Sequence, residues 1–255
     1  MSDHDLAIRD IILSAFGHAG QKCSACSVVL LEPELYEDND FLNRLADAAK
    51  SLPVGSAWEN DSIVTPLILE PSETLHRAFT TLDNNEKWLL KPEPNPDNPR
   101  LWSPGIKIGV EPGSWSHVTE FFGPVVSIIK ASDLDEGLRL ANTSKYGLTA
   151  GIHSLDETQL EKWAEYIQAG NLYINRAITG AIVQRQPFGG CKESCFGPGA
   201  KAGGPNYLLQ LSEITEPEFK SDDREPRSAE LRDKIIEWPD LDKDTLNTYL
   251  SLAAS

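Results

Sequence analysis

The stretch AFGHAGQKCSACS, residues 15–27, places a cysteine on a glycine-marked turn between two apolar segments. A thiol attacks a carbonyl carbon only as its thiolate, so the surroundings of Cys23 must lower its pKa or supply a base. Lys22 is adjacent, and free amides of the turn could point at the sulfur. A single cysteine is more often a small packed residue. Cys23 is therefore a nucleophile, a metal ligand or a core residue.

Metal binding or redox chemistry is the competing interpretation of the cysteines. Cys23-x-x-Cys26 and Cys191-x-x-x-Cys195 could together supply four zinc ligands, and CSAC could be a redox pair. Structural zinc usually stabilises small domains that lack a core, whereas 40% of this chain is apolar. We therefore rank a cysteine-ligated metal or redox module lowest.

A second glycine-rich stretch, PFGGCKESCFGPGAKAGGPNY, covers residues 187–207. Clustered glycines allow backbone amides to approach a ligand closely and to adopt positive φ. The stretch follows NLYINR, a predicted strand that we expect to end beside the active cleft of a parallel sheet. The alternative is a flexible surface loop.

Composition limits the classes of partner. The formal charge of this 255-residue chain is 23 − 39 = −16, which repels nucleic acid phosphates and anionic membrane surfaces, so we expect neither as a partner. No apolar run approaches the ~18 residues that span a bilayer. The amino terminus lacks a basic segment followed by an apolar run, which predicts a cytoplasmic protein with reduced thiols.

Helices and short strands alternate along the chain. Apolar residues recur at helical spacing in five segments: residues 5–16, 41–49, 75–82, 134–141 and 160–167. The β-rich runs are SVVLL, GIKIGV, VVSII, LTAGI and NLYI, while KPEPNPDNPR reads as a loop. Ser132 and Ser154 resemble the first residues of capping boxes. This order predicts an α/β fold with an open, twisted, mostly parallel sheet and flanking helices.

Several motifs occur together in the order and approximate spacing of one family. They are FGHAGQKCSA, TEFFGPVV, NTSKYGLTAG, GNLYINRAITGAIVQRQPFGG and GPGAKAGGPNY. Over residues 1–212 the chain resembles the catalytic domain of the aldehyde dehydrogenase superfamily. The last two motifs are similar to the branch that oxidises L-glutamate γ-semialdehyde to glutamate in proline breakdown, including the dehydrogenase portion of bifunctional proline utilization A proteins.

The resemblance implies a role for each matching residue. Cys23 would be the nucleophile that forms a thiohemiacetal with the aldehyde, passes hydride to NAD and leaves a thioester for hydrolysis. Its amide would donate to the oxyanion. Glu120 would accept hydrogen bonds from the nicotinamide ribose, and Phe122 would pack beside it. The Ser24 hydroxyl and the amides of Gly203 and Gly204 would hold the substrate's own carboxylate.

The sequence also departs from the family pattern. Only 22 residues precede Cys23, fewer than the roughly 30 of a βαβ unit, so we expect this chain to lack the nucleotide-binding domain. We expect a catalytic-domain fragment that acts with a separate nucleotide-binding domain. Cys191, Glu193 and Cys195 replace an aromatic residue, a basic residue and a glycine, and Cys195 falls where φ could need to be positive.

The end of the chain completes the predicted organisation. NYLLQLSEI is predicted as an edge strand that joins a neighbouring subunit, so we expect a homo-oligomer. Residues 213–255 are acidic and broken by prolines, and we interpret them as a linker with a short helical tail. The alternative to an enzyme fragment is a non-catalytic remnant or interaction module that retains the fold.

Overall fold

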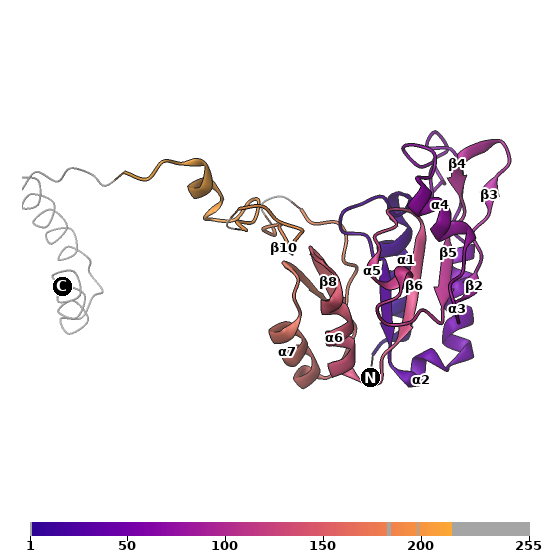
Figure 1. The fold of residues 1–255 in the computed structure, drawn as a ribbon, viewed down its shortest axis with the longest axis horizontal. Coiled ribbons are helices and arrows are strands. Elements are labelled where there is room, and N and C mark those ends of the chain that lie inside the picture. Colours follow the sequence, from indigo (N-terminus) through magenta and orange to yellow (C-terminus); the bar gives the residue numbers. More distant parts are fainter. Residues whose placement is uncertain (1, 183–184, 198, 216–255) are drawn as a thin grey trace, which may run out of the picture. The chain divides into compact units, whose positions relative to one another are not determined.

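The computed structural model describes residues 2–182, 185–197 and 199–215 (Figure 1). Backbone contacts divide the chain into two units, Met1–Gln210 and Leu211–Ser255. Apart from residues 213–215, the predicted linker and helical tail lie outside the described residues. Within the described part, no helix combines the length and apolar character needed to cross a membrane.

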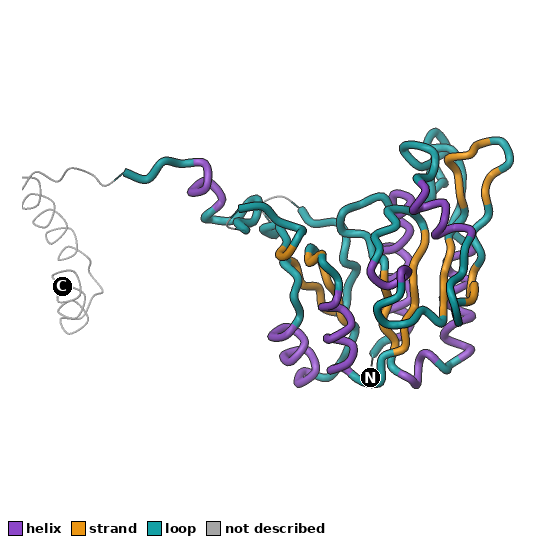
Figure 2. The backbone as a smooth tube through the Cα atoms, in the orientation of Figure 1, coloured by secondary structure: helices purple, strands orange, loops and turns teal. Residues whose placement is uncertain are grey.

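The first unit is built on a mixed sheet whose strand order is β1-β6-β5-β2. Figure 2 shows the strands of this unit in orange and its helices in purple. Its strands are β1 (Val28–Leu31), β6 (Val125–Lys130), β5 (Gly105–Ile108) and β2 (Lys87–Leu90). The first three are parallel, and β2 is an antiparallel edge strand. β8 (Thr149–Ile152) pairs in parallel with β9 (Asn171–Ile174) in a separate two-stranded sheet. The predicted α/β class is confirmed, with its strands divided between these sheets.

All five predicted helices are present. They are α1 (His4–Phe16), α3 (Asn39–Lys50), α4 (Glu73–Thr80), α6 (Leu134–Thr143) and α7 (Glu157–Tyr166), with two short helices, α2 (Pro33–Tyr36) and α5 (Trp115–Val118), between them. The predicted caps are wrong by one or two residues. Asp133 and Asp156, rather than Ser132 and Ser154, accept the free amides of α6 and α7. An aspartate caps as well as a serine, and its charge also favours the helix dipole.

Two loops differ from their prediction. The proline-rich loop contains a small hairpin of β3 (Pro94–Asn95) and β4 (Asn98–Trp102), because the Asn95 side chain accepts the amides of Asp97 and Asn98 at 2.9 and 3.1 Å and closes the turn. The predicted edge strand is a 3-10 helix, η2 (Tyr207–Leu211). A strand needs a partner for its ladder, and here the amides of Tyr207 and Leu209 bond locally instead.

The main hydrophobic core lies between the four-stranded sheet and the helices α1, α3 and α4. α1 and α3 pack against each other, and their apolar faces meet the strands. Among the most deeply buried side chains are Phe16, Phe41, Leu45, Phe79, Ile106 and Ile128. The core therefore holds fixed the end of α1, which leads directly into the segment that carries Cys23.

A lysine occupies the middle of this sheet. Lys107 in β5 is only 1% exposed, and its Nζ donates to Glu86 Oε2 at 3.1 Å, to the Thr81 carbonyl at 2.8 Å and to Ser116 Oγ at 3.2 Å. The rings of Trp88, Trp115 and Phe121 lie around the ammonium group. Burial lowers the pKa of Lys107, and the hydrogen bond that Lys107 donates to Glu86 opposes that shift.

We predict that Lys107→Met destabilises the protein by about 3–5 kcal/mol, because it leaves the Glu86 carboxylate buried without its cation. The double variant Lys107→Met with Glu86→Gln should lose less stability than the sum of the two single variants. Urea unfolding of the four proteins measures this coupling. Strictly additive losses would show that the pair is not energetically coupled.

His117 is buried between α5 and α6. Its Nδ1 accepts the Gly113 amide at 2.9 Å, which leaves Nε2–H to donate to the Leu140 carbonyl at 3.2 Å. Desolvation is the main cause that lowers the pKa of His117 below 6.5, because the ring is satisfied in its neutral form. Protonation of Nδ1 would break the bond to Gly113.

Stability should therefore decrease as the pH falls below 6.5. In the window between that value and the lower pKa of the folded state, the unfolded chain binds a proton at His117 that the folded chain does not. Urea unfolding at pH 7.5 and at pH 5 measures the difference. His117→Asn should reduce this pH dependence, whereas His18→Asn, at an exposed position, should not. An equal pH dependence in all three proteins would contradict the assignment.

Candidate functional site

The segment after α1 turns the chain sharply before it presents Cys23. His18, Ala19 and Gly20 are successive left-handed residues, with φ of 55°, 53° and 66°. The Ala25 amide then bonds to the Lys22 carbonyl at 3.0 Å, which closes a turn with Cys23 and Ser24 at its centre. We call the left-handed Gly20 and this turn together, residues 20–25, the nucleophile turn. The Cys26 amide bonds to the Ser14 carbonyl at 2.9 Å and anchors this turn to α1.

The two neighbouring cysteines have opposite environments. Cys23 is exposed, and among the described residues neither its amide nor its thiol has a hydrogen-bond partner. Cys26 is partly buried, and its thiol donates to the Val28 carbonyl at 3.4 Å. Burial raises the pKa of the Cys26 thiol to about 12. Cys23 is thus the accessible thiol of this pair, with a free amide beside it.

Glu120 and Phe122 lie on a turn between α5 and β6, which we call the Phe122 turn (residues 120–123). Glu120 is exposed and has no partner among the described residues. Phe121 points into the core and stacks on Trp115, with ring centroids 5.1 Å apart. Phe122 is 41% exposed and left-handed at φ 56°, a conformation that costs a residue with a side chain roughly 1–2 kcal/mol.

The nucleophile turn and the Phe122 turn meet through their backbones. A side chain at Gly20, the first residue of the nucleophile turn, would collide with the carbonyl oxygen of Gly123, and Gly20 itself has positive φ. Only glycine satisfies both conditions. Two segments about 100 residues apart in the sequence are therefore held in direct contact beside Cys23.

A cavity of about 670 Å³ reaches both turns, although neither Gly20 nor Gly123 lines it. Cys23 and Glu120 both line it, as do Arg176 and Ile178 from the segment after β9. The Ile178 amide donates to Ser14 Oγ at 3.0 Å, which ties that segment to α1. The prediction that the chain leaving NLYI borders the same cleft as Cys23 is therefore confirmed.

The other predicted site residues are not gathered at this cavity. Ser24 is buried within the nucleophile turn. Gly203 has φ 75°, and the Gly204 amide donates to the Lys201 carbonyl at 2.9 Å. Neither glycine is among the described residues that line the cavity of Cys23. In this structure the Gly203–Gly204 turn packs against residues 187–189 instead.

The departures from the family pattern have local explanations. Cys191 lies in β10 (Cys191–Lys192), which pairs with β7 (Tyr146–Gly147), and its thiol approaches the Gly147 carbonyl at 3.5 Å. Glu193 forms an exposed ion pair with Lys145 at 3.1 Å. The expected positive φ at Cys195 is wrong, because the left-handed residue is Lys192, at φ 53°. Lys192 is held there by hydrogen bonds from its ammonium group to two carbonyls at the end of α6.

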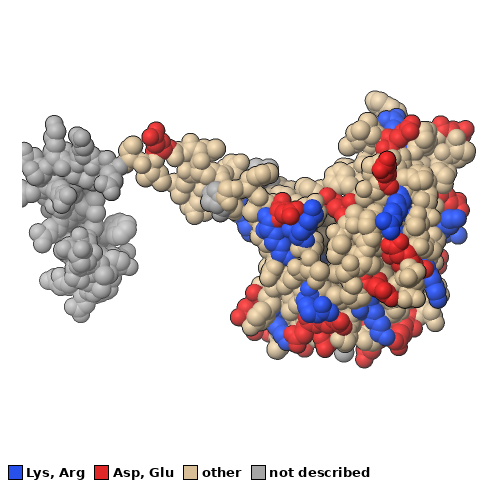
Figure 3. Space-filling model, viewed as in Figure 1, with Lys and Arg blue, Asp and Glu red and all other residues tan. Residues whose placement is uncertain are grey.

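The described residues contain no group of three or more His, Cys, Asp or Glu side chains placed to hold a metal ion. On the face shown in Figure 3, acidic and basic side chains are interspersed and form no continuous basic surface.

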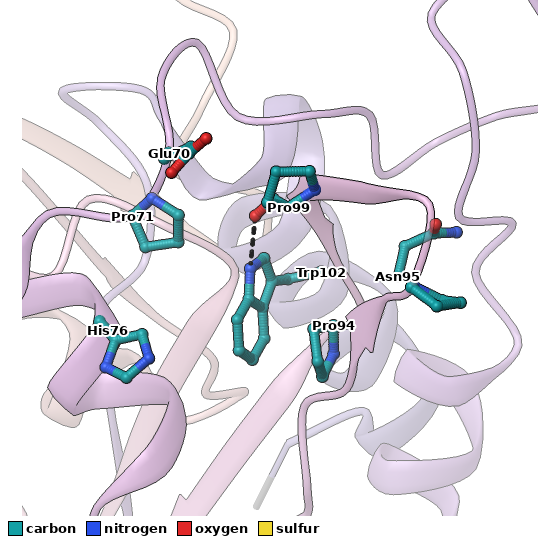
Figure 4. Close-up of a pocket in the computed structure, with 8 residues that line it drawn as sticks. Glu70, Pro71, His76, Pro94, Asn95, Pro99 and Trp102 are labelled. Atoms are coloured by element: carbon teal, nitrogen blue, oxygen red, sulfur yellow. Dashed lines mark hydrogen bonds between the residues drawn. The ribbon is translucent and has the colours of Figure 1, made fainter.

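A second, smaller pocket of about 350 Å³ lies apart from the cavity of Cys23 (Figure 4). Trp102 forms its floor and donates from its indole nitrogen to the Pro99 carbonyl at 3.1 Å. Pro71, His76 and Glu70 line one side of it. None of the site residues predicted from the sequence contributes to it.

Sequence reasoning missed Gln21, Arg176 and Ile178. Arg176 and Ile178 follow a predicted strand, so their position beside the cleft could have been proposed. Gln21 lies two residues before Cys23, but its side-chain contacts involve Ile68 and Phe122, which no local pattern connects to it.

Comparison with known proteins places this geometry in context. The family model described as aldehyde dehydrogenase family matches residues 1–216. The 1-pyrroline-5-carboxylate dehydrogenase of Geobacillus sp. (strain WCH70) is 38% identical over 209 residues, which are 82% of this chain and 40% of that protein. The enzyme of the same name from Bacillus subtilis (strain 168) is 37% identical with the same coverage. The chain thus spans about two fifths of the length of these curated relatives.

Solved structures show the same relationship. Proline utilization A from Corynebacterium freiburgense is 50% identical with a TM-score of 0.79, over 88% of this chain and 24% of that one. The 1-pyrroline-5-carboxylate dehydrogenase from Thermus with bound NAD is 35% identical with a TM-score of 0.76, over 84% and 41% of the two chains. The family match covers most of the chain and includes both turns of the site, so this protein belongs to the aldehyde dehydrogenase family.

Proposed function

We propose that this chain is the thiol-bearing catalytic part of an NAD-dependent dehydrogenase that oxidises L-glutamate γ-semialdehyde to glutamate. The observation that carries the proposal is the contact between the nucleophile turn and the Phe122 turn, with Cys23 and Glu120 lining one cavity. The relatives named 1-pyrroline-5-carboxylate dehydrogenase and proline utilization A support the choice of substrate.

The chemistry assigned to the chain begins at Cys23. Its sulfur attacks the aldehyde carbon and forms a thiohemiacetal, while the unpartnered Cys23 amide donates to the oxygen that becomes negative. Ser24 and the amides of Gly203 and Gly204 are the proposed holders of the substrate carboxylate. For Gly204 this requires its amide to leave the Lys201 carbonyl when substrate binds. Among the described residues, the Gly203 amide has no hydrogen-bond partner.

The residues of the Phe122 turn fit a dinucleotide. Glu120 has a free, exposed carboxylate, which suits the two hydroxyls of a ribose, and Phe122 offers an exposed ring next to it. NAD, when bound, accepts a hydride from the substrate carbon. Glu120 and Phe122 would hold the ribose and the nicotinamide beside Cys23, and the remaining contacts would come from a nucleotide-binding domain.

We predict that Cys23 is the most reactive of the four thiols. At pH 8 a thiol with a pKa of about 12 is ionised in about one molecule in ten thousand, so Cys26 should stay unlabelled. Limited iodoacetamide treatment followed by peptide mass spectrometry measures this. Faster labelling of Cys191 or Cys195 than of Cys23 would contradict the assignment of the nucleophile.

We predict that the chain alone makes no NADH from L-glutamate γ-semialdehyde. A mixture with the part of the Bacillus subtilis relative that the chain does not match should form NADH, detected by its absorbance. Cys23→Ala should abolish the rate in the mixture, by at least about a thousandfold if the thiol is the nucleophile. Cys26→Ala, a matched change three residues away, should leave most of it.

Two outcomes would contradict the proposed function. The first is a rate in the mixture that does not depend on Cys23. The second is a mixture that associates and stays folded but forms no NADH, which would favour the alternative of a non-catalytic module that retains the fold. Association can be followed separately by size-exclusion chromatography.

A further inference from the structure

We propose that Gln21 is a positioning residue that sets the spacing between the nucleophile turn and the Phe122 turn. Its side-chain Oε1 accepts the Ile68 amide at 3.0 Å, and its Nε2 donates to the Phe122 carbonyl at 3.2 Å. The two partners are 47 and 101 residues away in the sequence. One side chain therefore joins three separate segments immediately before Cys23.

Glutamine is suited to this position because its two bonds run in opposite directions. The side-chain amide has a carbonyl oxygen that accepts and an NH₂ group that donates. The partners fix its orientation, because a flipped amide would set its NH₂ against the Ile68 N–H and its oxygen against the Phe122 carbonyl. Glutamate could keep only the bond to Ile68, and methionine could keep neither.

Each segment that Gln21 bonds to is itself anchored. The two hydrogen bonds of Gln21, which we call the Gln21 clamp, therefore fix the position of one segment relative to the other. The Leu67 amide, next to Ile68, bonds to the Arg100 carbonyl of β4 at 2.8 Å. On the other side, the Val125 amide bonds to the Gly123 carbonyl at 2.8 Å, and Phe121 is buried against Trp115. The Phe122 turn between these anchors is left-handed and its ring is exposed, so it needs an external tie to stay in place.

The functional meaning rests on the proposed function. If Phe122 forms a wall of the cofactor site and Cys23 is the nucleophile, then Gln21 holds the wall at a fixed distance from the sulfur. Gly20 sets the closest approach of the two turns, because its missing side chain admits the Gly123 carbonyl. Gln21 prevents the turns from separating. Reaction geometry is sensitive to displacements of about 1 Å, so such a clamp affects rate as well as stability.

The test compares Gln21→Met and Gln21→Glu with a matched control, Gln159→Met. Gln159 also uses its side-chain oxygen in one hydrogen bond, to Ser154 Oγ at 2.7 Å, on α7. Amide hydrogen exchange of Ile68, and the ¹⁹F resonance of Phe122 in fluorophenylalanine-labelled protein, report the two bonds separately. The alkylation rate of Cys23 by a bulky maleimide relative to iodoacetamide reports the opening between the turns.

In Gln21→Met we expect the Ile68 amide to exchange about tenfold faster and the Phe122 resonance to move or broaden. The alkylation rate of Cys23 by maleimide should increase relative to its rate with iodoacetamide. In Gln21→Glu the Ile68 amide should stay protected while the Phe122 resonance changes. Gln159→Met should leave the exchange of Ile68 and the resonance of Phe122 unchanged, and it should change the alkylation ratio less than Gln21→Met does, since Gln159 lines the cavity of Cys23 but bonds to neither turn. In the NADH-forming mixture, Gln21→Met should lower kcat more than Gln159→Met does.

The proposal is overturned if Gln21→Met leaves Ile68 exchange and the Phe122 resonance unchanged, or if Gln159→Met changes them equally. Should Gln21→Met not fold, Gln21→Glu decides alone, through its split effect on Ile68 and Phe122. The exchange, resonance and alkylation readouts do not require turnover. A chain without dehydrogenase activity could therefore still show the clamp, and failure of the clamp would not contradict the proposed function.

Discussion

The site depends on a backbone contact between two glycines. Gly20 follows the core-anchored helix α1, and Gly123 precedes the central strand β6. The first can approach the carbonyl oxygen of the second only because Gly20 has no side chain at that point. Cys23 on one segment and Glu120 on the other thereby line the same cavity. The sheet and its core make the contact rigid, since both segments are anchored within one packed layer.

The strand and helix pattern could be read from the sequence because it is a local property. The run VVLL predicts a strand, and the apolar spacing over residues 5–16 predicts a helix, without reference to any distant residue. The division of the strands between separate sheets could not be read, since LTAGI and NLYI look the same whichever strands they pair with. The hairpin at Asn95 was hidden because its turn depends on a side-chain bond rather than on strand-forming residues.

The candidate site was predictable in part for the same reason. Cys23, Glu120 and Phe122 were found through motifs, and the structure brings Cys23 and Glu120 to one cavity. The Gly203–Gly204 turn matches its motif equally well, yet in this structure it packs against residues 187–189. Motifs record which residue types occur, whereas the distance between two turns depends on tertiary contacts. Gln21 shows the converse, because its partners lie far away in the sequence.

The buried pair of Lys107 and Glu86 restricts which substitutions this sequence can accumulate during evolution. Aromatic rings and a carboxylate surround the ammonium group of Lys107 in β5. A change of either charged residue alone therefore leaves the other buried in the protein interior without its partner. A substitution that removes one of the two charges is therefore tolerated only after, or together with, a compensating change at the other position. Among homologues the two positions should be inherited as a unit, with either the whole ion pair or a wholly apolar replacement beneath the Phe122 turn.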